Sequence, residues 1–235
     1  MELSIFAEEV PPNTQKLTRF LDELYRSSSS VGKIEILVKT ETQERHLRMR
    51  IWSKGKEQSL VIIDEPAREA GTATLKVGDN LWNYLPKISR TIRIPPSMML
   101  SPWMGTDFTN DDLVKKSSFE HDFESQIEGP SEEPKGWKLV MNVKPGIVGR
   151  WQKIECLIDN EYLPHIARFY DRKGRLARTF EYSDFRVLGG RKIPTHIRLV
   201  SEDQPGHETE LRYLEMVFDV NLPDSLFSLS QLERK

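Results

Sequence analysis

The sequence predicts an α+β fold that is mainly β, with one large curled antiparallel sheet and covering helices. Helical spacing of apolar residues is confined to short segments, whereas most of the chain alternates apolar and polar residues with a period of two. Short turn signals separate these segments, so neighbouring strands pair antiparallel. We expect about ten or eleven strands, and an open sheet of that size curls because strand twist accumulates.

The first predicted element is a helix that begins after Pro11-Pro12, with Asn13 or Thr14 as its cap. Its apolar residues recur at helical spacing and predict a face that packs on the sheet: Leu17, Phe20, Leu21 and Leu24. The serine run at 27–30 ends it. Residues 1–12 are expected to be a flexible N-terminal segment of a single domain that spans residues 1–235.

Strands are predicted from Ile34 onward, and 60–63 is apolar on both faces, which is typical of a central strand covered on both sides. In the second half of the chain, alternation predicts a strand over 119–127 and then a polar loop over 129–136. The last strand is expected over 208–219, and a closing helical turn over 224–232.

Residues 97–108 break the alternation, and Pro102 and Gly105 within them predict irregular structure. Thr109 and Asp112 follow at capping-box spacing, which predicts a short helix. The irregular segment is rich in methionine and tryptophan, although loops normally run over the surface. We therefore expect it either to plug the sheet or to form a mobile apolar lid, although core packing remains the ordinary role of such side chains.

The composition argues against several classes of protein. The net charge is −2, so the basic excess of a nucleic-acid-binding protein is missing. No apolar run approaches the roughly 18 residues of a spanning helix. The single cysteine, Cys156, excludes an internal disulfide framework, and its place in an alternating stretch predicts a buried structural thiol.

Motifs for catalysis and for metal binding are also missing from the sequence. The five histidines are scattered and none belongs to HExxH, GxSxG is absent, and Gly32-Lys33 lacks the rest of a phosphate loop. The paired acids Asp111-Asp112 fit the first turn of a helix, where the dipole favours negative charge. We therefore expect no enzyme activity, no catalytic residue, no metal and no cofactor.

Several segments together resemble a known family. They are Trp52-Ser53-Lys54-Gly55 through 59–62, Gly71 through Leu81-Trp82-Asn83-Tyr84-Leu85-Pro86, and Met104-Gly105-Thr106-Asp107-Phe108 through Asp111-Asp112-Leu113. In order and spacing they resemble the LolA-like family of outer-membrane lipoprotein-sorting proteins, in its broad, poorly characterised branch rather than LolA itself. The resemblance runs from about residue 16 to the ending at 224–227, and it leaves Arg45, Arg48 and Arg50 as candidates for the lid-latching arginine.

The resemblance implies an incomplete β-barrel with helices as a lid, located in the periplasm of a Gram-negative bacterium. Members hold the acyl chains of lipoproteins or related lipids in the hollow, so we expect a carrier or chaperone with lipid partners and membrane-associated donor and acceptor proteins, and no nucleic acid. The chain is expected to be a mature form without its leader peptide. The alternative is a non-catalytic envelope adaptor or structural protein that docks a protein partner.

The predicted site has two groups of residues. The expected lining, with the choice of face open by one register, is Leu60, Ile62, Trp82, Tyr84, Ile92, Ile94, Met98, Met99, Trp103 and Met104. The residues expected at the rim, near lipid headgroups, are Arg48, Arg50, Arg90 and Arg93. Acyl lipid that co-purifies with the protein would favour the carrier, and a dry interior fully filled by side chains would favour the adaptor.

Overall fold

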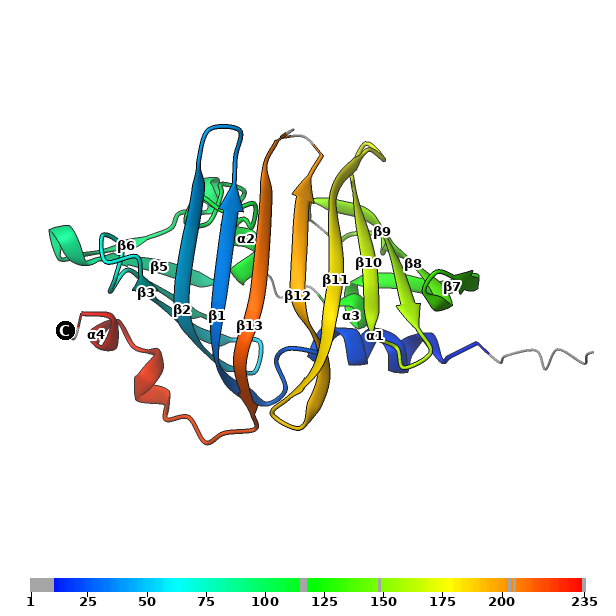
Figure 1. The fold of residues 1–235 in the computed structure, drawn as a ribbon, viewed down its shortest axis with the longest axis horizontal. Helices are drawn as coiled ribbons and strands as arrows, with labels where there is room; N and C mark the ends of the chain where they lie inside the picture. The colour runs from blue at the N-terminus through cyan, green and yellow to red at the C-terminus, as the bar shows by residue number, and fades with distance from the viewer. Residues whose placement is uncertain (1–10, 115–117, 148, 203, 205, 234–235) are drawn as a thin grey trace, which may run out of the picture.

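The computed structural model describes residues 11–114, 118–147, 149–202, 204 and 206–233. Among these, thirteen strands form one antiparallel sheet, more than the ten or eleven expected. Most of these strands are long. The sheet curls, but it does not close into a barrel (Figure 1). The strands are β1 (Ser29–Lys39), β2 (Glu44–Lys54), β3 (Gln58–Glu65), β4 (Ala73–Val77), β5 (Asn80–Leu85), β6 (Arg90–Arg93), β7 (Phe123–Glu132), β8 (Lys135–Val143), β9 (Trp151–Asp159), β10 (Pro164–Asp171), β11 (Leu176–Leu188), β12 (Arg191–Ser201) and β13 (Glu208–Phe218).

Short helices accompany the sheet. They are α1 (Thr14–Glu23), η1 (Pro86–Ile88), η2 (Pro96–Met98), α2 (Asn110–Val114), α3 (Phe119–Asp122), η3 (Asp224–Phe227) and α4 (Leu229–Leu232). The predicted first helix is confirmed, with the Asn13 side chain accepting a hydrogen bond from the backbone N–H of Lys16 at 3.0 Å. Of the N-terminal segment expected to be flexible, residues 1–10 lie outside the described residues.

The strand order shows the path of the chain. It runs outward from β1 at the centre to β6 at one edge, and returns from β7 at the other edge to β13, which pairs with β1. The connection from β6 to β7 therefore has to pass from one edge of the sheet to the other. In Figure 1 its helices α2 and α3 lie behind the central strands, on the same side as α1. This side is the concave one, and we call the space inside the curl the hollow.

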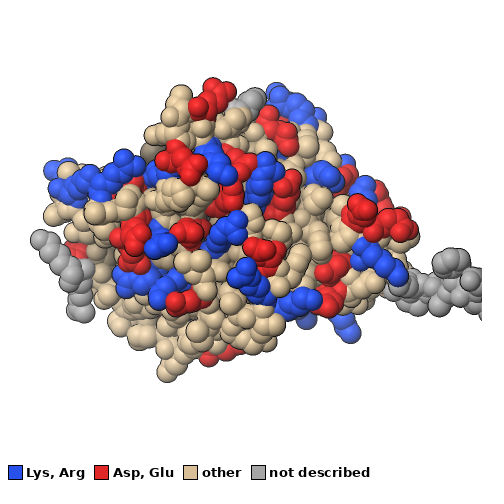
Figure 2. All heavy atoms as spheres, viewed as in Figure 1, with Lys and Arg blue, Asp and Glu red and all other residues tan. Residues whose placement is uncertain are grey.

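Alternation gives the two faces of the sheet different character. The side chains that point into the hollow build the main core, which includes the fully buried Ile36, Leu47, Met49, Leu139, Met141, Ile154 and Ile158. Burying each such side chain contributes about 1.5–3 kcal/mol to folding. The opposite face of the central strands is covered with interspersed basic and acidic side chains (Figure 2). The apolar face is therefore inside the curl.

A second, smaller core lies on the opposite face of β3 to β5, under the C-terminal segment. There Phe227 of η3 and Leu232 of α4 are buried against the sheet, which confirms the predicted closing turn. Cys156 is also buried as predicted, and burial raises the pKa of its thiol to about 12.

Two local predictions for the second half are wrong. Residues Phe119–Asp122 form a helical turn and not a strand, because the Ser118 side chain caps it by accepting from the backbone N–H of His121 at 3.3 Å. The expected loop over 129–136 is instead the end of β7, a tight turn and the start of β8. Pro130 is tolerated there because β7 is an edge strand, where a missing N–H donor breaks no ladder.

Candidate functional site

The segment that crosses the hollow is fastened to the sheet by polar contacts. We call residues 96–112 the strap. The first contact is with β4, where the indole Nε1 of Trp103 donates to Oγ1 of Thr74 at 3.1 Å. The guanidinium of Arg45 on β2 donates to the carbonyl oxygen of Met104 and also pairs with Glu69. Of the three arginines considered as a lid latch, Arg45 is the one that contacts the strap.

Two further contacts fasten the far half of the strap to later strands. Asp107 accepts a hydrogen bond from the hydroxyl of Thr209 on β13 at 2.7 Å, and its backbone N–H donates to the same hydroxyl at 3.0 Å. Asp112 then pairs with Arg178 on β11. The contacts thus proceed from β4 through β2 and β13 to β11, following the strand order across the hollow.

Trp103 is buried inside the hollow, where it contacts β4. Its side chain is 3% exposed and belongs to the main core, with Met104 and Phe108 packed beside it. The segment was expected either to plug the sheet or to form a mobile apolar lid. In this structure Trp103 and Met104 pack in the core as a plug. The predicted capping box at Thr109 and Asp112 is also confirmed, with the backbone N–H of Thr109 donating to Asp112 at 2.8 Å.

Two of the cavities in the described part of the chain lie in the hollow, and Asp112 of the strap lines both. The first, of about 240 Å³, lies between α1 and β8 to β11, and its apolar wall includes Met141, Ile154 and Phe169. The second, of about 230 Å³, lies over β1 to β3 and is bounded by Trp103 and Val61. Tyr25, Arg26 and Asp112 line both cavities. Each is smaller than the roughly 300–1,000 Å³ of most ligand pockets, so a large ligand has to displace part of the strap.

The aromatic hydroxyls of the hollow are neutral. Tyr25 stacks on Tyr213 with ring centroids 4.7 Å apart, and its hydroxyl donates to the carbonyl of Pro194 at 2.9 Å. Burial raises the pKa of Tyr25, and likewise the pKa of Tyr182 and of Tyr213. These rings therefore add apolar area to the cavity walls without adding charge.

A buried ion pair joins the strap to the floor of the first cavity. Arg178 is 5% exposed, and its two terminal nitrogens donate to the two oxygens of Asp112 at 2.8 and 2.7 Å. Burial alone raises the pKa of the Asp112 carboxyl, but the charge and hydrogen bonds of Arg178 outweigh it and hold that pKa below its usual value. The Asp112 carboxyl is therefore ionised at neutral pH.

Several residues predicted to line the hollow lie elsewhere. Leu60, Ile62, Trp82 and Tyr84 belong to the second core, on the opposite face of the sheet under the C-terminal segment. The face was chosen one register off. Strand 60–63 is apolar on both sides, so alternation does not distinguish the side facing the hollow, where Val61 and Ile63 lie, from the side under η3 and α4.

The remaining predicted lining residues divide between the strap and the sheet edge. Ile94 and Met99 pack on Leu81 in a small separate cluster, whereas Ile92 and Met98 are 43% and 46% exposed. Trp103 and Met104 thus are the members of the predicted set that the structure brings into the hollow.

The four predicted rim arginines do not gather at the cavities. Arg48 and Arg50 lie on the outer face, where Arg48 pairs with Glu35 at 3.0 Å and Arg50 with Asp64 at 2.8 Å. Arg90 and Arg93 are exposed on the edge strand β6. Alternation accounts for this placement, since Arg48 and Arg50 flank the buried Met49 and must point away from it.

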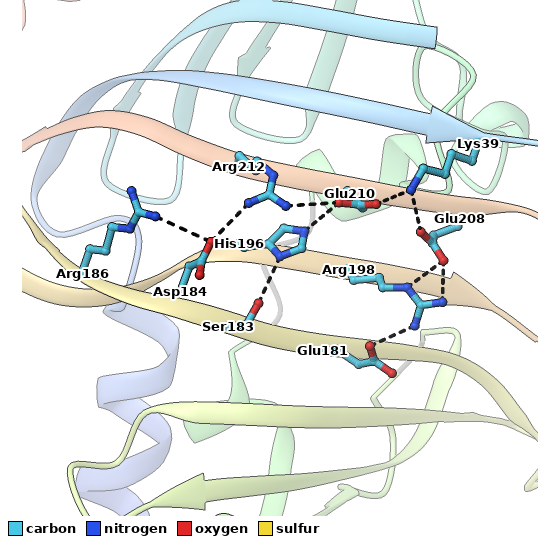
Figure 3. A network of polar contacts seen from close by, with 10 residues as sticks. All are labelled: Lys39, Glu181, Ser183, Asp184, Arg186, His196, Arg198, Glu208, Glu210 and Arg212. Carbon is cyan, nitrogen blue, oxygen red and sulfur yellow. Dashed lines mark hydrogen bonds and ion pairs between the residues drawn. The ribbon is translucent and has the colours of Figure 1, made fainter. Parts of the chain in front are cut away.

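The outer face carries a polar network that the sequence motifs did not indicate (Figure 3). His196 bonds the hydroxyl of Ser183 at 3.0 Å through Nδ1 and the carboxylate of Glu210 at 2.9 Å through Nε2. Glu210 is also held by Lys39 at 2.5 Å, and chiefly this hydrogen bond lowers its pKa to about 2 although burial opposes the shift. These residues line neither cavity, and their contacts join β1, β11, β12 and β13 as cross-strand pairs.

None of the helices in the described part of the chain combines the length and apolar character needed to cross a bilayer. No group of three or more His, Cys, Asp or Glu side chains there is arranged to hold a metal ion.

The chain was compared with known proteins. A family model described as "Uncharacterized protein" matches residues 55–234, whereas no curated protein gives a significant match. Among solved structures, a DUF1329 family protein from Desulfovibrio piger is 22% identical over 95% of this chain and 100% of that chain, with a TM-score of 0.83. A LolA superfamily protein from Nitrosomonas europaea is 27% identical over 94% and 99%, with a TM-score of 0.76.

A third structure has the same fold. It is a protein from Vibrio parahaemolyticus assigned as an outer membrane lipoprotein-sorting protein domain, 22% identical over 94% of this chain and 98% of that chain, with a TM-score of 0.76. All three superpositions cover nearly the whole chain. This chain therefore shares its overall fold with these proteins.

Proposed function

Because this chain belongs to the LolA-like family, we propose that it is a periplasmic carrier or chaperone that binds the acyl chains of lipoproteins or other lipids in its hollow. The observation that carries this proposal is an apolar hollow closed by a strap that is fastened at a few polar points. The proposed activity has no catalytic step and needs no cofactor.

The strap fills part of the hollow, but cavities of about 240 and 230 Å³ remain, so the interior is not fully filled as the adaptor would require. Energetics favour a carrier whose hollow is partly occupied by its own side chains before cargo enters. Burying one methylene contributes about 0.8 kcal/mol, so a sixteen-carbon chain gains on the order of 12 kcal/mol on leaving water. A carrier that kept all of this energy would not release its cargo. A strap that competes for the same space lowers the net affinity, because ligand binds only the fraction of molecules in which the strap is displaced.

The geometry suggests how the cargo enters. Trp103 belongs to the main core and lines the second cavity, and Asp112 of the strap lines both cavities. If the strap lifts, its aromatic and methionine side chains vacate space between walls that are already apolar. The acyl chain then replaces Trp103 and its neighbours without a change in the strands.

The likeness to lipoprotein-sorting proteins supports a role in transfer between membranes. We propose membrane-associated donor and acceptor proteins as partners, with outer-membrane lipoprotein sorting as the process. The alternative, an envelope adaptor that docks a protein, needs no exchange between strap and cargo. The two proposals therefore differ in whether the hollow takes up lipid.

Native mass spectrometry of the full chain, purified without detergent from a periplasmic extract, tests the carrier. We expect added masses that organic extraction identifies as acyl lipids, and binding of dansylaminoundecanoate methyl ester by the delipidated protein. Val61→Glu places a charge in the wall of the second cavity and should abolish that binding. Val187→Glu, the same change at a residue 67% exposed, is the matched control and should leave it unchanged. A bare protein mass and no uptake of either dansylaminoundecanoate or its methyl ester would refute the carrier and leave the adaptor.

A further inference from the structure

We infer that Arg178 is a binding site for the oxyanion of an acyl-chain amphiphile, and that Asp112 occupies this site until cargo enters. The inference rests on the proposed carrier function and names its cargo class as amphiphiles with a carboxylate or phosphate group. Arg178 lies in the wall of the first cavity beside apolar residues that suit an acyl chain. A charged group and an apolar wall thus adjoin, as an anionic amphiphile requires.

Aromatic rings of the sheet also hold the guanidinium of Arg178 in place, independently of the strap. Its central carbon lies 4.4 Å from the ring centroid of Trp151, 4.9 Å from that of Phe169 and 5.0 Å from that of Phe180. These rings come from β9, β10 and β11, and stacking on them stabilises a cation. The cation therefore keeps its position when the strap moves.

Asp112, by contrast, belongs to the strap. Its carboxylate meets the two terminal nitrogens of Arg178 in the two-pronged geometry by which arginine binds carboxylates and phosphates. The Oδ2 atom of the same carboxylate also accepts a hydrogen bond from the hydroxyl of Thr109, within the strap. Asp112 thus occupies the position that the oxyanion of a ligand would take.

The acid does not satisfy the cation completely. The Nε atom of Arg178 is buried and has no hydrogen-bond partner among the described residues. Buried donors are nearly always paired, so a lone donor on a cation beside a cavity indicates capacity for a further acceptor. A phosphate or a differently seated carboxylate supplies that acceptor.

Charge balance makes the site selective. If the strap lifts and a neutral ligand enters, Arg178 is left buried without a counter-ion, which is strongly unfavourable. An anionic amphiphile replaces Asp112 and keeps the pair intact. The other charged side chains on this cavity are Asp22 and Arg26, and Asp22 is already engaged by the backbone N–H of Phe119 at 3.0 Å. Arg178 is the cation on this cavity that pairs with Asp112 of the strap, so the exchange takes place there and not at Arg26.

The test compares two probes that differ only in charge, dansylaminoundecanoate and its methyl ester, titrated into the delipidated full chain. Asp112→Asn keeps the shape of the occupant and removes its charge, so we expect the carboxylate probe to bind about tenfold tighter or more and the ester to gain much less. Arg178→Met keeps the bulk of the side chain, and should remove the preference for the carboxylate while the ester still binds. Thermal unfolding checks that each variant folds, and Asp112→Asn carries the test if Arg178→Met does not.

Three results would overturn the inference. Equal affinity for the two probes in the wild type and in Asp112→Asn would refute an oxyanion site while the carrier stands. Failure of both probes to bind any variant would refute the carrier as well. Competition distinguishes an amphiphile from a free anion: dodecyl phosphate should displace the carboxylate probe, and displacement by inorganic phosphate at the same concentration would show a site for the anion alone.

Discussion

Replacing Trp103 with alanine separates the two contributions that this side chain makes, one to the fold and one to the closed strap. Trp103 is 3% exposed and donates a hydrogen bond to Thr74 at 3.1 Å. Truncating a buried tryptophan costs about 3–5 kcal/mol. If about 3 kcal/mol of this stabilises the closed strap against the lifted one, the apparent affinity for an acyl ligand rises by up to about 100-fold.

Two measurements on the same variant test this reasoning. Urea unfolding gives the loss of stability, and titration with dansylaminoundecanoate methyl ester gives the affinity without involving a charged headgroup. Trp137→Ala is the matched control, because Trp137 is also buried in the main core, at 8% exposure, but lines neither cavity. It should lose stability and leave the affinity unchanged.

The opposite pattern would contradict the competition between strap and cargo. If Trp103→Ala loses stability like the control and binds the ester no more tightly than the wild type, Trp103 is a core residue only. Tighter binding together with lower stability is the combination that a competing plug requires.

Three further predictions concern other parts of the molecule. The pKa of Glu210, near 2 in the folded protein and near 4.5 unfolded, lies lower in the folded state, so its stabilising contribution is present above pH 4.5 and lost as the pH falls toward 2. Glu210→Gln should therefore flatten the pH dependence of urea unfolding in that window, and an unchanged profile would count against the pairing with Lys39. Burial and a thiol pKa of about 12 should keep Cys156 unreactive toward Ellman's reagent until urea unfolds the chain, and rapid labelling of the native protein would contradict this. Gly136→Ala should destabilise the protein by about 1–3 kcal/mol or more, since the new Cβ would lie 2.1 Å from a carbonyl oxygen of β9, whereas Gly129→Ala, with open space, should be nearly neutral by the same unfolding assay.

Alternation predicted most strands whose opposite face is polar. Ile34, Ile36 and Val38 alternate with polar or half-buried residues, and the structure buries these three in the main core. The same reasoning fails over 60–63, because η3 and α4 cover the face that would otherwise be solvated. That cover comes from the far end of the chain, and no local pattern reports it.

Local capping determined where other predictions held or failed. The spacing of Thr109 and Asp112 predicted the start of α2, since a capping box acts within one turn. At Ser118 the cap overrides the apolar alternation that begins at Phe119, and the expected strand starts later, at Phe123.

The central pair of the candidate site could not be predicted from the sequence. Asp112 and Arg178 are 66 residues apart, and each has an ordinary local explanation, as a helix cap and as a strand arginine. They meet because the strap crosses the sheet between its two edge strands, β6 and β7, and because the strand order places β11 along that path. Sequence patterns within one element contain no information on the strand order or on the path of the strap.

The pairing of β1 with β13 determines when the molecule can fold. Strands β1 to β6 and β7 to β13 are each built from hairpins between neighbours, which form early because little loop entropy is lost. The seam between these two ladders joins remote parts of the chain, and beside it the hydroxyl of Ser29 donates to the carbonyl of Val220, 191 residues away. Until β13 has been synthesised, both ladders expose an unpaired edge and an apolar face, a state prone to aggregation. Folding to the binding-competent form is therefore late and depends on the last strand.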